Sequence, residues 1–120
     1  MKSFAVSICI FLLLLAAIVT NTCYVTQVCD TLAEQLTALP EVEAAEAEAG
    51  ALFDYWDRQR DLLGISVSAH TLERMSEHLV EMEYAIRCGD AVTFEKNRQT
   101  ALYMCDEIAE TERFSLKNWI

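Results

Sequence analysis

Residues 3–29 read SFAVSICIFLLLLAAIVTNTCYVTQVC and contain no charged side chain. Within them, eleven of the sixteen residues 4–19 are Phe, Leu, Ile or Val. At about −0.3 to −0.6 kcal/mol for each such residue, membrane insertion gains roughly −3 to −7 kcal/mol as an upper bound. A helix needs about 20 apolar residues to cross the hydrocarbon, and residues 3–22 supply them. The stretch therefore predicts a transmembrane helix.

A cleaved secretory signal is the alternative, because one lysine before an apolar core is also the shape of a signal peptide. Cleavage needs small residues directly before the cut, yet Ala16 and Ala17 lie inside the apolar run. Residues 20–23, TNTC, also lack the pattern of a lipoprotein cleavage site. We therefore expect residues 1–22 to be an uncleaved signal-anchor. Cleavage after about Thr22 would instead release a secreted, soluble helical protein.

Charge predicts the orientation of this anchor. Lys2 precedes the apolar run and no basic residue follows it until Arg58, so the N-terminus is expected in the cytoplasm and residues 23–120 outside. Because Lys2 is the only charge before Asp30, the remaining 19 acidic and 8 basic residues give the rest of the chain a formal charge of −11. Such a field repels nucleic acid and anionic lipid headgroups, which excludes nucleic-acid binding.

The rest of the chain is patterned as an all-α domain. It is long enough for one small hydrophobic core, and no useful β-alternation occurs in it. Pro40 separates the helix that continues the anchor from the next one, and Gly64 ends that next helix. Gly89 and Asp90 supply a left-handed stop and a new N-cap. The predicted helices are 23–38, 41–63, 67–88 and 91–113, with Ser66 or Ser68 capping the third.

Each predicted helix has one apolar face with three- and four-residue spacing. These faces are Val25, Val28, Leu32, Leu36 and Leu39; Ala45, Ala49, Leu52, Trp56 and Leu63; Leu72, Met75, Leu79, Met82 and Ile86; and Phe94, Ala101, Leu102, Cys105 and Ile108. Short connections make consecutive helices antiparallel neighbours, so we expect an up-down bundle of about four helices, the first of which continues the transmembrane helix.

The predicted helix lengths place two apolar segments close to the membrane. At about 1.5 Å per residue, the path out and back brings the loop after Gly64 and the C-terminal tail close to the bilayer. That loop carries Ile65 and Val67, and the tail carries Phe114, Leu116, Trp119 and Ile120. We expect either that the tail docks at the headgroup zone or that Phe114 and Trp119 close the end of the bundle.

The five cysteines do not predict a disulfide framework. Cys88 and Cys105 would lie roughly 20 Å apart along a helical hairpin, and Cys23 and Cys29 are six residues apart on one helix. The odd count and the absence of a Cys-x-x-Cys motif argue against a zinc site or a redox activity. An intermolecular bridge through Cys23 or Cys29 is the alternative to idle or buried thiols.

Two histidines, His70 and His78, are the basis of an enzymatic alternative. They lie eight residues apart, so they do not form the pairing of a helical metal site, and further ligands would have to come from other helices. A small metal-dependent hydrolase built on His70, His78 and neighbouring glutamates would require these side chains to meet in one pocket. Polar or surface histidines are the preferred interpretation.

The rows of acidic residues are also expected to be solvent-exposed and not to form a metal site. Glu73, Glu77 and Glu81 repeat every four residues and predict a solvated helix face. The acidic run at residues 41–48 lacks the ligand spacing of a calcium loop. We therefore expect no catalytic residue, no metal ligand, no cofactor-binding residue and no cofactor. Trp56 is expected to be a core residue.

Several motifs, taken in order, resemble domain-of-unknown-function family 4363. They are the short anchor, Trp56, HTLER at residues 70–74, CGD at 88–90 and SLKNWI at 115–120. The resemblance implies a small, single-anchor helical membrane protein of a Gram-positive, mostly spore-forming bacterium. The extra cysteines, the Glu/Ala-rich run 41–49 and Trp119, where Ile is more usual, depart from the family pattern. The family implies no activity and no catalytic residues.

These observations together predict a non-catalytic interaction or scaffold module at the outer face of the cell membrane. The lipid bilayer is the expected partner of the segment from Phe4 to Thr22. The sequence also leaves open a membrane-protein partner or a homodimer. In a homodimer, Val25, Val28, Leu32 and Leu36 would form a coiled coil instead of packing within one chain.

Overall fold

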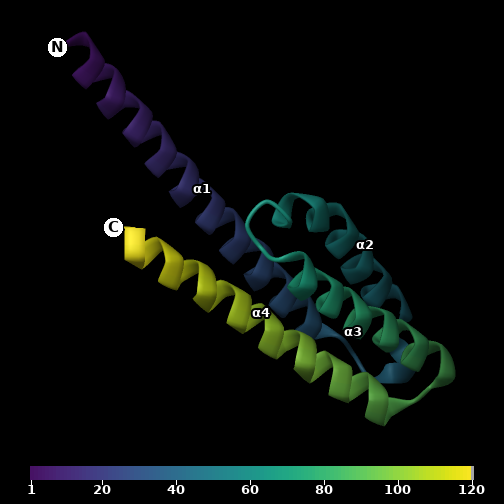
Figure 1. The fold of residues 1–120 in the computed structure, drawn as a ribbon. Helices are drawn as coiled ribbons and strands as arrows, with labels where there is room; N and C mark the ends of the chain where they lie inside the picture. Colours follow the sequence, from purple (N-terminus) through teal and green to yellow (C-terminus); the bar gives the residue numbers. More distant parts are fainter. Residues whose placement is uncertain (120) are drawn as a thin grey trace.

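The computed structural model describes residues 1–119, with Trp119 described by its backbone alone. The elements are α1 (Lys2–Ala38), the 3-10 turn η1 (Val42–Ala44), α2 (Glu46–Leu63), α3 (Ala69–Cys88) and α4 (Ala91–Trp119). No strand occurs within the described range. The first half of α1 projects from a bundle that its second half forms with the other helices (Figure 1). The all-α fold with an apolar N-terminal helix continuing into a bundle is confirmed.

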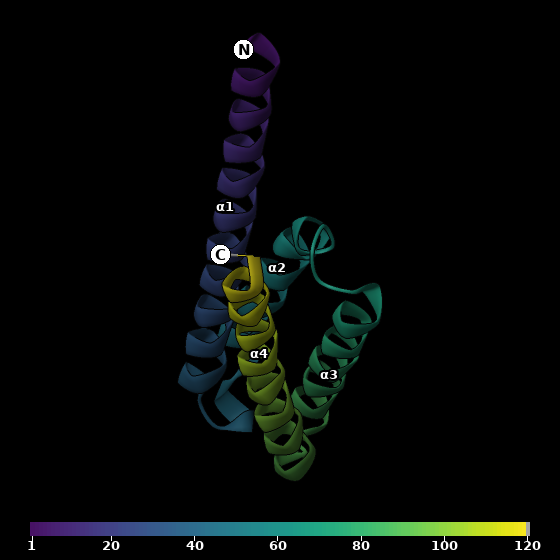
Figure 2. The same ribbon diagram turned by 60° about the vertical axis from the view of Figure 1, so that its left-hand side comes forward.

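The bundle has an up-down-up-down path. Both α2 and α4 pack against α1 and α3, and α4 makes the larger contact with each. Figure 2 shows α4 between the second half of α1 and α3. The helix termini that connect α1 to α2 and α3 to α4 lie at the end of the bundle away from the anchor, and the α2–α3 loop and the C-terminus lie at the anchor end (Figure 1).

The helix ends follow the predicted signals. Ser68 caps α3 by accepting a hydrogen bond from the Thr71 backbone N–H at 3.2 Å. Gly89 ends α3 with φ at +68°, the left-handed conformation that glycine adopts without a steric penalty. Asp90 then caps α4: its carboxylate accepts from the Thr93 N–H at 3.2 Å and from the Thr93 hydroxyl at 2.7 Å. Of the two predicted caps for α3, Ser68 is the one used.

The core is built almost entirely from the predicted apolar faces. All five predicted residues of α1 and its extension are buried, as are all five of the second face. On α3 the seam shifts in the last turn, where Ala85 is buried and Ile86 is half-buried. On α4, Leu102 is half-buried, and three further residues join the core: Asn97, Met104 and Ala109.

Two helix boundaries differ from the prediction by more than two residues. The second helix begins at Glu46 and not at 41, because the 3-10 turn at Val42–Ala44 turns Val42 into the core. The last helix continues to Trp119 and not only to 113, since no glycine or proline interrupts residues 114–119. The loop residue Val67 is buried, whereas Ile65 in the same loop is exposed.

Candidate functional site

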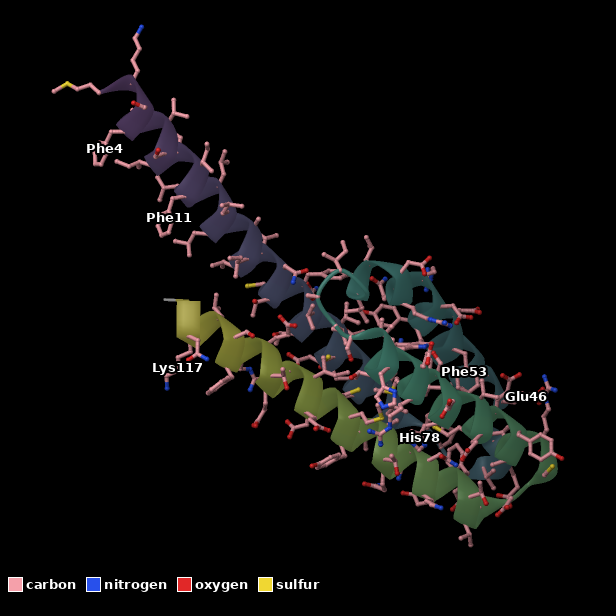
Figure 3. The ribbon with its side chains drawn as sticks, viewed as in Figure 1. Phe4, Phe11, Glu46, Phe53, His78 and Lys117 are labelled. Atoms are coloured by element: carbon pink, nitrogen blue, oxygen red, sulfur yellow. The ribbon has the colours of Figure 1, made fainter. Side chains whose placement is uncertain are left out.

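The first half of α1 is the most unusual surface of the molecule. An 18-residue window in this helix is apolar enough to cross a membrane, and none of that window is buried. The side chains of Phe4 and Phe11 extend from the projecting helix without contact to the bundle (Figure 3). Exposed apolar surface of this size marks an interaction with a membrane or another protein.

Burial begins abruptly within the same helix. Residues 2–14 are all exposed, and the first buried residue is Thr22, at 5% exposure, followed by Val25 and Val28. Between these two parts, Leu15, Ile18, Val19 and Asn21 are half-buried. No break separates the exposed part of α1 from the buried part. One rigid helix therefore joins the apolar segment to the bundle core.

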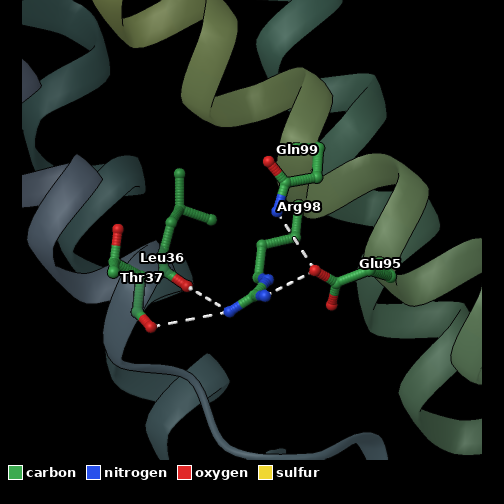
Figure 4. A network of polar contacts seen from close by, with 5 residues as sticks. All are labelled: Leu36, Thr37, Glu95, Arg98 and Gln99. Atoms are coloured by element: carbon green, nitrogen blue, oxygen red, sulfur yellow. Dashed lines mark hydrogen bonds and ion pairs between the residues drawn. The ribbon is translucent and has the colours of Figure 1, made fainter.

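The end of α1 is held by an arginine from α4. The Arg98 guanidinium donates to the backbone carbonyl oxygens of Leu36 and Thr37, at 3.4 and 3.5 Å (Figure 4). The last carbonyls of a helix lack the usual donor four residues on, and here the Leu36 carbonyl also accepts a long bond from the Leu39 N–H at 3.4 Å. A cation at this end also complements the helix dipole. Arg98 also pairs with Glu95, whose pKa is lowered by hydrogen bonds from Arg98 and Gln99. Residue 98 of α4 is thereby level with about residues 36 and 37 of α1.

Two buried thiols lie farther along the same interface. Cys29 of α1 and Cys105 of α4 are 5% and 2% exposed. Burial raises the pKa of each thiol to about 12, and Cys29 and Asp30 add to the effect at Cys105. All five cysteines are free, and Cys9, Cys23 and Cys88 are exposed. The sequence did not predict that Cys29 and Cys105 would share an interface.

A cleft of about 300 Å³ lies between the start of α3 and the second half of α4. Val67, Met104 and Ile108 supply its apolar lining. The polar lining residues are Ser66, Ser68, Thr71, Arg74, Glu107, Thr111 and Glu112. Burial raises the pKa of the Glu112 carboxyl. No histidine or cysteine is among the described residues that line the cleft, so its hydroxyl groups have no imidazole base beside them.

The two histidines do not converge on a pocket. His70 lies exposed in the first turn of α3, about 12 Å along the helix axis from His78. The His78 imidazole bonds to the Asn97 side chain, with 2.9 Å between Nδ1 and Oδ1. Because the Asn97 amide donates to the Thr93 carbonyl, its oxygen is the acceptor and His78 Nδ1 carries the proton. His78 therefore satisfies the polar group of Asn97, which is 1% exposed.

The acidic rows are solvent-exposed, and Trp56 is a core residue. Within residues 1–119 there is no cluster of three His, Cys, Asp or Glu side chains with the geometry of a metal site. Glu73, Glu77 and Glu81 are exposed on α3. Trp56 is buried, and its indole N–H donates to the Ser76 hydroxyl at 2.9 Å, which ties α2 to α3.

The predicted coiled-coil seam is already used within the chain. Val25, Val28, Leu32 and Leu36 are each at most 3% exposed in the single chain. A homodimer through these residues would require the bundle to open. Any dimer of the folded chain must use another surface.

Sequence reasoning missed two polar residues that organise the bundle, Asn97 and Arg98. Asn97 lies three residues after Phe94 and four before Ala101, so the spacing of the apolar face contained a signal for its burial. Arg98 gave no such signal, because its partners on α1 are about 60 residues away in the sequence.

Comparisons with protein-family models, with curated proteins and with solved structures found no match to this chain.

Proposed function

We propose that this chain is a single-pass membrane protein that presents a helical, non-catalytic interaction or scaffold module at the outer face of the cell membrane. The observation that carries the proposal is the continuity of α1, whose exposed apolar half runs without a break into a half that forms part of the bundle core. An anchor and a domain that share one helix keep a fixed orientation relative to each other. The resemblance to domain-of-unknown-function family 4363 implies the same kind of small, single-anchor helical membrane protein.

Partial burial of the outer anchor residues supports retention of the N-terminal segment. Leu15, Ile18 and Val19 are half-buried, whereas residues 4–14 are exposed. Cleavage after Thr22 would remove these three side chains and expose the protein surface that now partly covers them. A segment that contributes to packing in this way is better explained as a permanent part of the protein than as a signal that is removed.

Cys88 provides a direct test of the orientation. It is exposed at the end of the bundle away from the anchor, and a chain with Cys9→Ala and Cys23→Ser retains it as the one exposed thiol among the described residues. We expect a membrane-impermeant maleimide to label this variant in intact cells, and the same chain with Cys88→Ser to remain unlabelled. Labelling that appears only after lysis would contradict an outward-facing bundle.

Crosslinking in intact cells tests the interaction role. We expect the full-length chain to be recovered with one fixed partner protein or with a second copy of itself. If crosslinking recovers only the single chain, the interaction role fails, while the anchor and its orientation still rest on the labelling experiment.

A further inference from the structure

The end of α4 extends past its partner helix. From the shared hairpin at Gly89, α3 has 20 residues and α4 has 29, or about 30 Å and 43 Å of helix. The last nine residues of α4 therefore continue beyond the start of α3 along the side of α1, as Figure 1 shows. Nothing in the packing of α3 against α4 requires these additional turns, which number about two and a half.

The contacts between α1 and α4 give the level that this extension reaches. The Arg98 side chain reaches the backbone carbonyls of residues 36 and 37. Farther along, Cys29 is close enough to Cys105 to raise the pKa of its thiol. Still farther along, Arg113 and Leu116 share a groove with Thr22. Because antiparallel helices advance one residue against one, the backbone of residue 119 is level with about residue 16 of α1. The half-buried residues of α1 lie in this same range.

This level is the outer end of the proposed transmembrane span. Residues 3–22 supply the roughly 20 apolar residues that a span needs, so residues 113–119 of α4 run beside its last two turns. Phe114 is 66% exposed there. The α2–α3 loop presents Ile65, 77% exposed, at the same end of the bundle.

The charge of this segment is opposite to that of the domain. Residues 23–120 carry a formal charge of −11, yet residues 113–120 contain Arg113, Lys117 and no acidic residue. Lys117 is exposed on the last turns of α4 (Figure 3). Basic side chains near apolar ones at a membrane boundary place their stems in the apolar zone and their charges at the lipid phosphates.

We propose that residues 113–119 of α4 and the loop residue Ile65 form a second membrane contact, in which Phe114 enters the outer edge of the hydrocarbon and Arg113 and Lys117 meet phospholipid phosphates. The occupant of this surface is the lipid bilayer, because the surface is continuous with the anchor and its charge complements phosphate. The inference rests on the proposed membrane anchoring. This second contact would hold the bundle against the membrane surface, so that the anchor and the bundle cannot tilt together relative to the bilayer.

Fluorescence quenching by brominated lipid tests the contact in the full-length protein. In a background with Trp56→Phe and Trp119→Phe, single tryptophans are placed by Phe114→Trp, Leu13→Trp and Val92→Trp. Leu13 is 70% exposed in the anchor, and Val92 is 80% exposed at the far end of the bundle. Each protein is reconstituted into vesicles of phosphatidylcholine and phosphatidylglycerol, with or without bromine on the upper part of the acyl chains. Circular dichroism confirms that each variant keeps its helices.

We expect Phe114→Trp to lose several-fold more fluorescence than Val92→Trp and to approach Leu13→Trp. If Leu13→Trp is quenched while Phe114→Trp behaves like Val92→Trp, the second contact is overturned and the anchor stands. An unquenched but blue-shifted Phe114→Trp would also overturn it, by showing that protein covers this site. If Leu13→Trp itself is not quenched and the protein does not float with the vesicles, the proposed anchoring fails.

Discussion

The buried thiols of the α1–α4 interface provide a quantitative prediction about the bundle. At pH 8, a thiol with the ordinary pKa of 9.0 is thiolate in about one molecule in ten, whereas a thiol with a pKa of about 12 is thiolate in about one in ten thousand. Since the thiolate is the nucleophile, ionisation alone slows alkylation of Cys29 and Cys105 by about 1,000-fold relative to an exposed thiol. Burial of both sulfur atoms adds steric protection.

Pulsed alkylation followed by peptide mass spectrometry measures this difference. The full-length protein in detergent micelles is treated with iodoacetamide at pH 8, and modification of each cysteine is followed over time. Cys88 is the internal reference, because it is exposed on the same molecule. We expect Cys88 to be modified about 1,000-fold faster than Cys29 or Cys105, and all three to react at similar rates in denaturant.

Rapid reaction of the buried thiols would refute the packing. If Cys29 and Cys105 both react within about tenfold of Cys88 in the folded protein, the α1–α4 interface is not closed as described. If only Cys105 is protected, α4 packs in the bundle but the register against α1 is wrong.

Three further predictions concern the stability of the bundle, measured by denaturant unfolding in micelles. Leu36→Ala should lower the free energy of unfolding by about 2 to 5 kcal/mol because it empties a fully buried site, whereas Leu13→Ala, in the exposed half of α1, should change it by less than about 0.5 kcal/mol. Equal effects would contradict the division of α1 into an exposed half and a half that packs in the bundle. Gly89→Ala should cost about 1 to 2 kcal/mol at φ +68°, while Gly50→Ala should add about 0.5 to 1 kcal/mol, since an added Cβ meets nothing within 4 Å in a helix interior; a destabilising Gly50→Ala would show that α2 is distorted there. Burial raises the pKa of Glu112, so the stability that this carboxyl contributes is full below its unfolded pKa and is lost as pH rises through its folded pKa. Glu112→Gln should therefore stabilise the protein at neutral pH but not at pH 4. An equal effect at both pH values would show that burial of the charged carboxylate is not the cause.

Much of the fold was predictable because its information is local. The spacing of the apolar residues gave the face of every helix, and Pro40, Gly64 and Gly89 marked where helices end. The two misplaced boundaries differ in kind. The start of α2 has a tertiary cause, because Val42 packs into the core through a 3-10 turn, and a single helical segment does not show this. The continuation of α4 past 113 has a local cause, since no glycine or proline interrupts residues 114–119.

The polar organisation of the bundle was much less predictable. His70 and His78 were the basis of the enzymatic alternative only, and the structure separates them. The hydrogen bond between His78 and the buried Asn97 was not predicted. Arg98 joins α4 to the end of α1 through backbone carbonyls, which every residue has and which therefore leave no mark in the sequence. Val67 was expected in a membrane-side loop with Ile65, but its side chain closes the core instead.

The intact mass of the protein in washed membranes tests the central claim most directly. The 120-residue chain is expressed without a tag, membranes are stripped with alkaline carbonate, and the mass of the extracted protein is measured by mass spectrometry. An uncleaved anchor predicts a mass of 13.6 kDa in the membrane fraction. Recovery of a chain that lacks about the first 22 residues, in the soluble fraction, would contradict the claim that α1 anchors the bundle and belongs to its core.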